Sequence, residues 1–135
     1  MFRINILITQ IKTVMKNIVL IVLLLLYIGC NETLDNSPAS IAEIVTESFY
    51  HNNDETLRKH TTPDGYANFS NLMNMFAKPK NSEMNFKVIE ESIDGDMAWV
   101  KYSTSYDKNP GIFKLVKVDG VWKVTSRKPN EKLPF

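Results

Sequence analysis

An apolar run that ends at the only cysteine of the chain limits which residues are left to form a folded domain. Lys16 precedes an uninterrupted apolar stretch, residues 18–28, and Gly29 and Cys30 follow it. A stretch of about 11 apolar residues suits the hydrophobic region of a secretory signal peptide, whereas a membrane-spanning helix needs about 20. The sequence therefore predicts a signal peptide over residues 1–29 and a folded part after Cys30.

The end of this stretch, Tyr27–Cys30, resembles the lipobox of bacterial lipoproteins, although Tyr27 stands where that motif usually has leucine. In such proteins the cysteine is acylated, with palmitate for example, and becomes the first residue of the mature chain. We therefore expect Cys30 to anchor the protein in the bacterial cell envelope, facing the periplasm or the cell surface. The alternatives are that Cys30 is the last residue of an ordinary signal peptide or an idle thiol. Met15 is the expected start of translation, and the alternative is a long basic segment before the apolar stretch, with Arg3, Lys12 and Lys16.

The residues from Cys30 onward can form one small domain. Removing residues 1–29 takes away Arg3, Lys12 and Lys16, which leaves 13 basic residues against 15 acidic ones. That balance is not typical of a nucleic-acid-binding protein. If the only cysteine is acylated, no disulfide can form, so the hydrophobic core alone must hold the domain together. We predict a lipidated cysteine and tether over 30–37, a domain over 38–127 and an irregular tail over 128–135.

Apolar residues recur at helical spacing after the tether. Ser37 and Pro38 suit the cap and the first turn of a helix. The expected buried face has the spacing of an amphipathic helix and comprises Ile41, Ile44, Val45, Ser48 and Phe49. A second, short helix is expected over 55–60 with a cap at Asp54, and a third over about 66–77, after a loop that includes Pro63.

After Met84 the apolar period changes to 2 residues, which is typical of strands. Two hairpins are expected, with strands over 85–93, 97–106, 112–118 and 121–127. A two-residue turn at Asp119-Gly120 would place Leu115 opposite Val124 and Lys117 opposite Trp122. The core face of this hairpin is then expected to carry Phe113, Leu115, Trp122 and Val124. The fold class is therefore α+β, with three helices packed on a curved four-stranded antiparallel sheet.

Several short motifs of the domain together resemble those of a known superfamily. They are Pro38, Ile44-Val45, Phe49-Tyr50, Asn53-Asp54, Thr62-Pro63, Ala98-Trp99-Val100 and residues 115–124. Over about residues 37–127 the chain resembles the small lumazine-binding-like lipoprotein domains of the nuclear-transport-factor-2-like superfamily, whose fold is cystatin-like and cone-shaped. The resemblance implies a sheet curled around the first helix, a pocket between them and frequent dimerisation. It implies no particular activity.

The resemblance also indicates where an acid–base site would lie. Enzymes with this fold place an aspartate with a histidine or a tyrosine in the apolar pocket, where burial raises the pKa of the carboxyl group. In this chain Glu91 is expected opposite Ala98 if Asp94-Gly95 forms a tight turn, and Asp96 is a second candidate. The residues expected to line the pocket are Met73, Phe76, Glu91, Tyr102 and Tyr106. A solvated glutamate at a sheet edge is the plainer interpretation, so we assign no catalytic residue.

The outer face of the sheet is expected to carry an apolar patch typical of a partner surface. Its residues are Phe86, Val88, Met97 and Trp99; the alternative is that they belong to the core. His51 and His60, expected on the surface at helix ends, lack metal-ligand spacing, so we expect no metal and no cofactor. The many lysines of the C-terminal third either protect sheet edges or form a patch for anionic lipid or glycan.

These observations predict a lipid-anchored extracytoplasmic domain that binds a ligand or acts as an adaptor, without catalysis. Two alternatives stay open: a pocket protein for a small apolar ligand, and a cone-fold acid–base enzyme. The expected partners are the membrane, reached through the lipid on Cys30, and a second copy of the chain or another protein. Nucleic acid is not expected as a partner.

Overall fold

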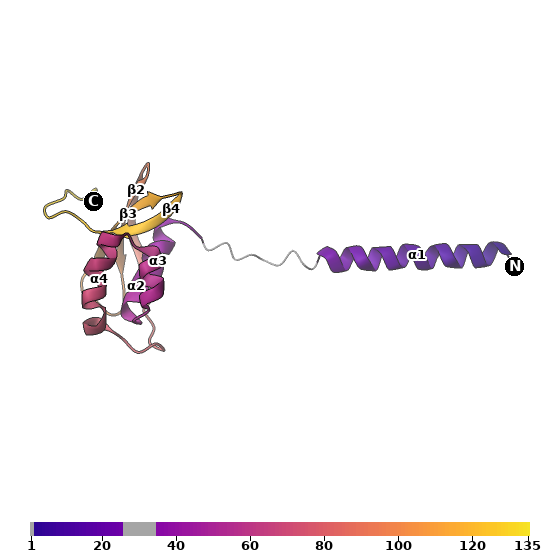
Figure 1. Cartoon of the computed structure of the whole chain (residues 1–135), viewed down its shortest axis with the longest axis horizontal. Coiled ribbons are helices and arrows are strands. Elements are labelled where there is room, and N and C mark those ends of the chain that lie inside the picture. Colours follow the sequence, from indigo (N-terminus) through magenta and orange to yellow (C-terminus); the bar gives the residue numbers. More distant parts are fainter. Residues whose placement is uncertain (1, 26–34) are drawn as a thin grey trace. The chain divides into compact units, whose positions relative to one another are not determined.

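The computed structural model of the chain describes residues 2–25 and 35–135 (Figure 1). The first part is one helix, α1 (Phe2–Leu25), in which the side chains of residues 2–18 are exposed. Among the described residues, no helix combines the length and the apolar character needed to cross a membrane. The expected lipidation site, Cys30, lies outside the described residues. Residues 35–135 form a separate compact unit.

Three helices form the first half of this unit. They are α2 (Pro38–Tyr50), α3 (Asp54–His60) and α4 (Pro63–Phe76). Ser37 caps α2 as predicted, because its Oγ accepts a hydrogen bond from the Ser40 N–H at 3.2 Å. Two boundaries differ from expectation. Asn53, rather than Asp54, caps α3, and α4 begins at Pro63, because Thr62 caps the helix and proline suits its first turn.

The second half is an antiparallel meander with the strand order β1-β2-β3-β4. Its strands are β1 (Lys87–Asp94), β2 (Met97–Ser103), β3 (Gly111–Val118) and β4 (Val121–Thr125). The predicted register of the second hairpin is confirmed, since Leu115 pairs with Val124 and Lys117 with Trp122.

The predicted register of the first hairpin is wrong by two residues. Its turn is Gly95-Asp96, with Gly95 at φ +57°, and not Asp94-Gly95. Glu91 therefore pairs with Val100, and Ile93 takes the place opposite Ala98. A β-bulge between Val88 and Glu90 interrupts the pairing further along β1. The bulge changes which residues of β1 face the helices.

The helices cover one face of the sheet, and the core lies between the two layers (Figure 1). The residues that are fully buried come from both layers and include Ala42, Val45, Leu57, Val100, Leu115 and Val124. Leu57, the only apolar residue of α3, has no exposed surface, so this short helix contributes a single apolar side chain to the core.

A continuous network of aromatic rings fills the interior beside this core. Tyr102 stacks on Phe86 at 5.1 Å between ring centroids and lies 4.8 Å from Phe113. Phe113 contacts Phe69 edge-on at 5.6 Å, and Phe69 lies 6.0 Å from Phe49. Edge-on and offset contacts are the favoured geometries for aromatic pairs. The space between α2 and the sheet is therefore occupied by side chains.

The edge of β4 is closed by polar contacts from the helical half. The Thr62 N–H donates to the carbonyl oxygen of Val124 at 2.9 Å. The Trp122 N–H donates to Oδ1 of Asn36 at 3.3 Å, and Nδ2 of Asn36 donates to the carbonyl oxygen of Gly120 at 3.1 Å. These bonds satisfy backbone groups that an edge strand would otherwise present to another chain.

Gly65 allows α4 to approach β4 closely. A Cβ at position 65 would lie 2.6 Å from the carbonyl oxygen of Val124. We therefore expect Gly65→Ala to lower the free energy of unfolding by about 1–3 kcal/mol, because backbone must move to relieve the contact. Urea unfolding of residues 35–135, followed by tryptophan fluorescence, measures this loss. Asn74→Ala, at an exposed position of the same helix, is the control; an equal loss in both variants would contradict the steric explanation.

Candidate functional site

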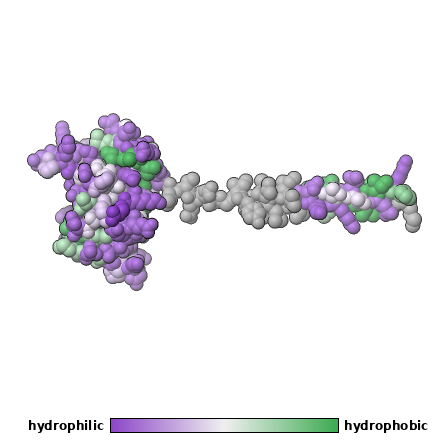
Figure 2. All heavy atoms as spheres, in the orientation of Figure 1, coloured by the Kyte–Doolittle hydropathy of each residue, from purple (hydrophilic) through white to green (hydrophobic). Residues whose placement is uncertain are grey.

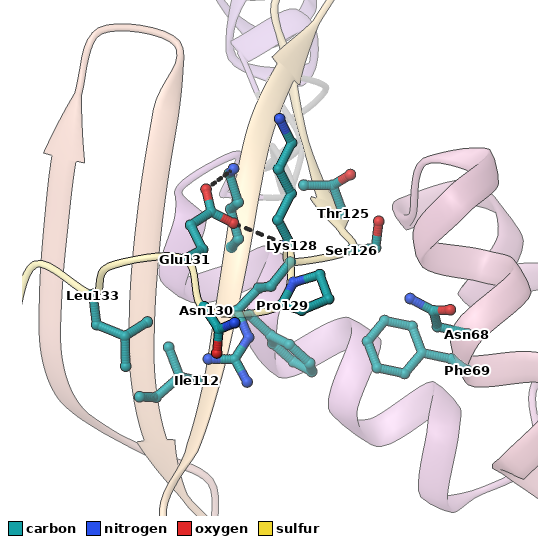
Figure 3. A pocket seen from close by; sticks show the side chains of 13 residues that line it. Asn68, Phe69, Ile112, Thr125, Ser126, Lys128, Pro129, Asn130, Glu131 and Leu133 are labelled. Carbon is teal, nitrogen blue, oxygen red and sulfur yellow. Dashed lines mark hydrogen bonds and ion pairs between the residues drawn. The ribbon is translucent and has the colours of Figure 1, made fainter.

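A hollow of the folded unit lies between α4, β3 and the C-terminal tail, residues 126–135. Its volume is about 490 Å³. The lining residues are Asn68 and Phe69 of α4, residues 112–114 of β3, and residues 125–131 with Leu133 at the end of β4 and in the tail. Figure 3 shows Asn68 and Phe69 projecting from α4 toward the tail, and Glu131 turned toward the strand.

The floor of this hollow, which we call the tail hollow, is apolar and rigidly supported. Phe69 and Phe113 meet there edge-on, and both belong to the aromatic network. Ile112 and Leu133 add aliphatic surface from the strand and from the tail. Phe113 also contacts the ring of Tyr102, so the floor is part of the packed interior of the domain.

The rim of the tail hollow is positively charged. Lys114, Arg127 and Lys128 line it, with Glu131 as the only acidic residue among the lining residues. Glu131 forms an ion pair with Lys114, and its Oε2 accepts a hydrogen bond from the Lys128 backbone N–H at 3.0 Å. Arg127 and Lys128 form no ion pair with a described residue. Two cationic side chains therefore stay available to an anion.

Glu131 holds the tail against the outer face of the sheet. Its hydrogen bond with Lys114, followed by that with the Lys128 backbone, lowers the pKa of the Glu131 carboxyl below its usual value. The Lys114 ammonium lies 5.6 Å from the ring of Trp99, and the Lys101 ammonium 5.9 Å from the ring of Phe135. Through these contacts with Lys114 and Lys101, the tail lies on the same face of the sheet as Trp99.

The residues expected to line an inner pocket lie in different surroundings. Met73 is buried and Tyr102 is held between two rings, whereas Phe76 is 47% exposed and Glu91 is exposed. Tyr106 contacts the ring of Tyr50 at 4.9 Å, and its hydroxyl lies 2.6 Å from that of Ser82. None of these residues lines the tail hollow.

The tyrosines of the interior are held in the neutral form. Burial raises the pKa of Tyr102 to about 12. Burial, and then the hydrogen bond that its hydroxyl donates to Asp107, also raise the pKa of Tyr50. Asp107 additionally receives a weak bond from Thr104, at 3.4 Å. Because Tyr50 also contacts the ring of Phe49, its hydroxyl joins the Asp107 carboxylate to the aromatic network.

The residues expected to form one outer patch lie on both faces of the sheet. Phe86 stacks on Tyr102 and packs against the core, and Val88 pairs with Tyr102, so both lie on the inner side. Met97 and Trp99 lie on the outer face as predicted, where Trp99 pairs with Lys114. The error arises from the bulge in β1, which shifts the alternation of side chains. Trp99 is only 7% exposed, so it offers little free surface.

The histidines were expected on the surface, and for His51 this is wrong. Its side chain is 15% exposed, its Nδ1 lies 3.8 Å from the Glu47 carboxylate, and its Nε2 is buried without a hydrogen-bond partner. It lines a second, polar hollow of about 430 Å³ with Asp54 and Lys80. Burial, with Lys59 and Lys123 nearby, lowers the pKa of His60. No group of ligands suited to a metal occurs among the described residues.

The tail hollow was not predicted from the sequence. The tail was expected to be irregular, and the structure gives it no helix or strand. The ion pair between Lys114 and Glu131 brings it to the sheet, but the partners lie 17 residues apart and follow no helical or strand period. The sequence signal that pointed toward the tail hollow is the concentration of basic residues in the C-terminal third, for which edge protection and a patch for anionic lipid or glycan were both open.

Comparison with known proteins supports the fold. Neither a protein-family model nor a curated protein matches the sequence. Among solved structures, the chain is similar to a protein of Campylobacter jejuni provisionally named an NTF2-like transpeptidase. The TM-score is 0.55 at 15% sequence identity, over 67% of this chain and 99% of that one. The predicted α+β, nuclear-transport-factor-2-like fold is therefore confirmed, whereas the narrower likeness to lumazine-binding-like domains stays a prediction.

The attachment of the tail depends on pH in a defined direction. The folded-state pKa of Glu131 is lowered, so its contact with Lys114 is complete above the usual glutamate range and is lost as the pH falls through that lowered value. We expect the indole N–H resonance of Trp99 to shift in that acidic range, because Lys114 leaves its ring.

Glu131→Gln is expected to move the Trp99 resonance toward its acidic position already at neutral pH. Glu55→Gln, which removes an exposed carboxylate of α3, serves as the control and should leave the resonance in place. NMR titration of both variants provides the measurement. An unchanged Trp99 signal in Glu131→Gln would show that the tail is not held by this contact.

Proposed function

We propose that this protein is a lipid-anchored binding domain of the bacterial cell envelope, and that its ligand carries an anionic group next to an apolar one. The observation that carries the proposal is the tail hollow, in which an aromatic floor lies beside the free cations Arg127 and Lys128. Binding sites commonly have volumes of about 300–1,000 Å³ and combine apolar walls with a few fixed polar groups.

The polar groups of the tail hollow favour a carboxylate, sulfonate or phosphate group. Guanidinium and ammonium groups bind such anions through charge-assisted hydrogen bonds. Asn68, Thr125 and Ser126 line the same hollow and add neutral donors. The ring faces of Phe69 and Phe113 can take an aromatic or aliphatic portion of the same ligand. The site therefore fits an amphipathic anion better than a purely apolar molecule.

The proposal of a lipid anchor rests on the sequence before the domain. The apolar stretch 18–28, the small Gly29 and the lone Cys30 follow each other in the order of a lipoprotein signal peptide. Stable attachment to a membrane needs about two acyl chains, and an acylated cysteine can carry them. The short polar segment after Cys30 then serves as the tether of the domain.

Binding is favoured over acid–base catalysis by the position of the carboxylates. A catalytic carboxylate needs desolvation to bring its pKa toward neutrality. Glu91 and Asp96, the two candidates, are both exposed. The aromatic network also fills the inner space in which the alternative ligand pocket was expected. We therefore propose a binding domain and place its ligand in the tail hollow.

The probe 8-anilinonaphthalene-1-sulfonate tests this site, because it combines aromatic rings with one anionic group. Residues 35–135 are expected to bind it with enhanced fluorescence. Arg127→Gln combined with Lys128→Gln should weaken binding by about tenfold or more, because a hydrogen bond to a charged group contributes about 1.5–3 kcal/mol. Fluorescence titration gives both dissociation constants, and circular dichroism shows whether the variant stays folded.

Lys87→Gln combined with Lys108→Gln is the matched control for this titration. It removes the same number of charges from exposed positions that do not line the tail hollow. Its dissociation constant should stay close to that of the unaltered domain. If both double variants weaken binding equally, net charge and not the tail hollow governs the interaction. If neither does, the probe binds elsewhere.

The lipid anchor is tested by the mass of the mature N-terminus. Membranes of a bacterium that produces the full chain should contain a peptide that begins at residue 30 and carries acyl mass. Cys30→Ala should abolish the acyl mass and release the protein from membranes. Tyr27→Leu, which restores the usual residue of the motif, should leave acylation intact. A peptide that begins at Cys30 with a free thiol would refute lipidation.

A further inference from the structure

The outer face of the sheet carries apolar side chains at the end where the hairpins turn. Met97 pairs with Val116, and Val118 pairs with Val121, so these four residues share one face. Met97, Val118 and Val121 are 37%, 40% and 42% exposed. Figure 2 shows strongly apolar side chains gathered at the end of the folded unit where β4 lies in Figure 1. We call these four residues the turn-end patch.

The first residues of the folded unit are fixed at this same end. Asn36 donates to the carbonyl oxygen of Gly120 and accepts from the backbone of Trp122, and so it is attached to the β3–β4 turn. The patch residues Val118 and Val121 flank that turn. Only five residues, 31–35, lie between Cys30 and Asn36. At about 3.3–3.6 Å for each residue, this segment spans roughly 20 Å when fully extended.

We propose that the turn-end patch rests on the lipid surface that holds the acyl chains of Cys30. This inference rests on the proposed lipid anchor and adds the surface of the domain that faces the membrane. The short covalent connection keeps the β3–β4 turn near the bilayer, and the apolar residues beside the turn gain from leaving water there. Because the lipid anchor holds the β3–β4 turn near the bilayer, the membrane is the surface expected to cover the turn-end patch.

Charges around the patch nearly cancel, so the contact depends on apolar burial. Lys117 and Lys123 lie on the second hairpin, Asp94 is the last residue of β1, and Asp96 and Asp119 belong to the two turns. Attraction to anionic lipid, which needs an excess of basic residues, contributes little at such a surface. Docking is accordingly expected to change little with the fraction of phosphatidylglycerol in the bilayer.

The opposite end of the folded unit offers a control position. α4 begins beside β4, where Gly65 approaches Val124, and runs for 14 residues, or about 21 Å, to Phe76. Met75, in its last turn, is 76% exposed and apolar. A probe at position 75 therefore reports an apolar, exposed site at the distal end of this helix.

The test uses the mature, acylated chain in vesicles of phosphatidylethanolamine and phosphatidylglycerol. The acyl chain blocks Cys30, so Val121→Cys or Met75→Cys supplies the only free thiol for a bimane label. Brominated acyl chains in the vesicles quench a label that enters the bilayer. We expect a blue shift and quenching at position 121, and neither at position 75. Val118→Asp, combined with the label at 121, should abolish both effects.

The outcomes separate this inference from the anchor on which it rests. An acylated N-terminal peptide with equal, water-like emission at positions 121 and 75 would overturn the membrane contact and leave the anchor in place. An unacylated peptide would overturn both. A blue shift at 121 without quenching by brominated lipid, together with cross-linked dimers, would assign the patch to a second copy of the chain and overturn the membrane contact.

Discussion

Tyr102, on the inner face of the sheet, determines which side chains pack between the sheet and the helices. Its ring stacks on Phe86 and contacts Phe113, and through Phe113 it supports Phe69 of α4. This arrangement requires glycine at position 111, because a Cβ there would lie 2.5 Å from the Tyr102 ring. Rings in contact from strand to helix occupy inner space that a cone-shaped fold can offer to a ligand, and the candidate site of this chain lies elsewhere.

The consequence is that the surfaces available for function lie outside the curl of the sheet. The tail hollow has its apolar floor on the outermost rings of the network, and its charged rim comes from the tail, which Glu131 attaches to Lys114. The turn-end patch lies on the outer face of the sheet, near the turn to which Asn36 is bonded. In this arrangement the helices and the sheet form a packed scaffold. The segments before and after them contribute the contacts on which the two proposed sites depend.

Local patterns predicted the elements, and long-range contacts account for the errors. Ser37 with Pro38 fixes the start of α2, and Asp119-Gly120 fixes the register of the second hairpin, because each depends on neighbouring residues alone. The first hairpin was misplaced because Asp94-Gly95 and Gly95-Asp96 are both suitable turns. The bulge in β1 and the ion pair that attaches the tail involve no repeated spacing, so neither the two-sided distribution of Phe86 and Trp99 nor the tail hollow could be derived from the sequence.

The claim on which this account depends is that ligands bind under the tail and not inside the sheet. NMR mapping of amide shifts in residues 35–135 during titration with 8-anilinonaphthalene-1-sulfonate tests it most directly. The account predicts that the largest shifts occur at Asn68, Ile112 and residues 126–131, with little change at Met73 and Tyr106. Shifts centred on Met73, Tyr102 and Tyr106 would show that the aromatic network opens to admit a ligand, and would contradict the account.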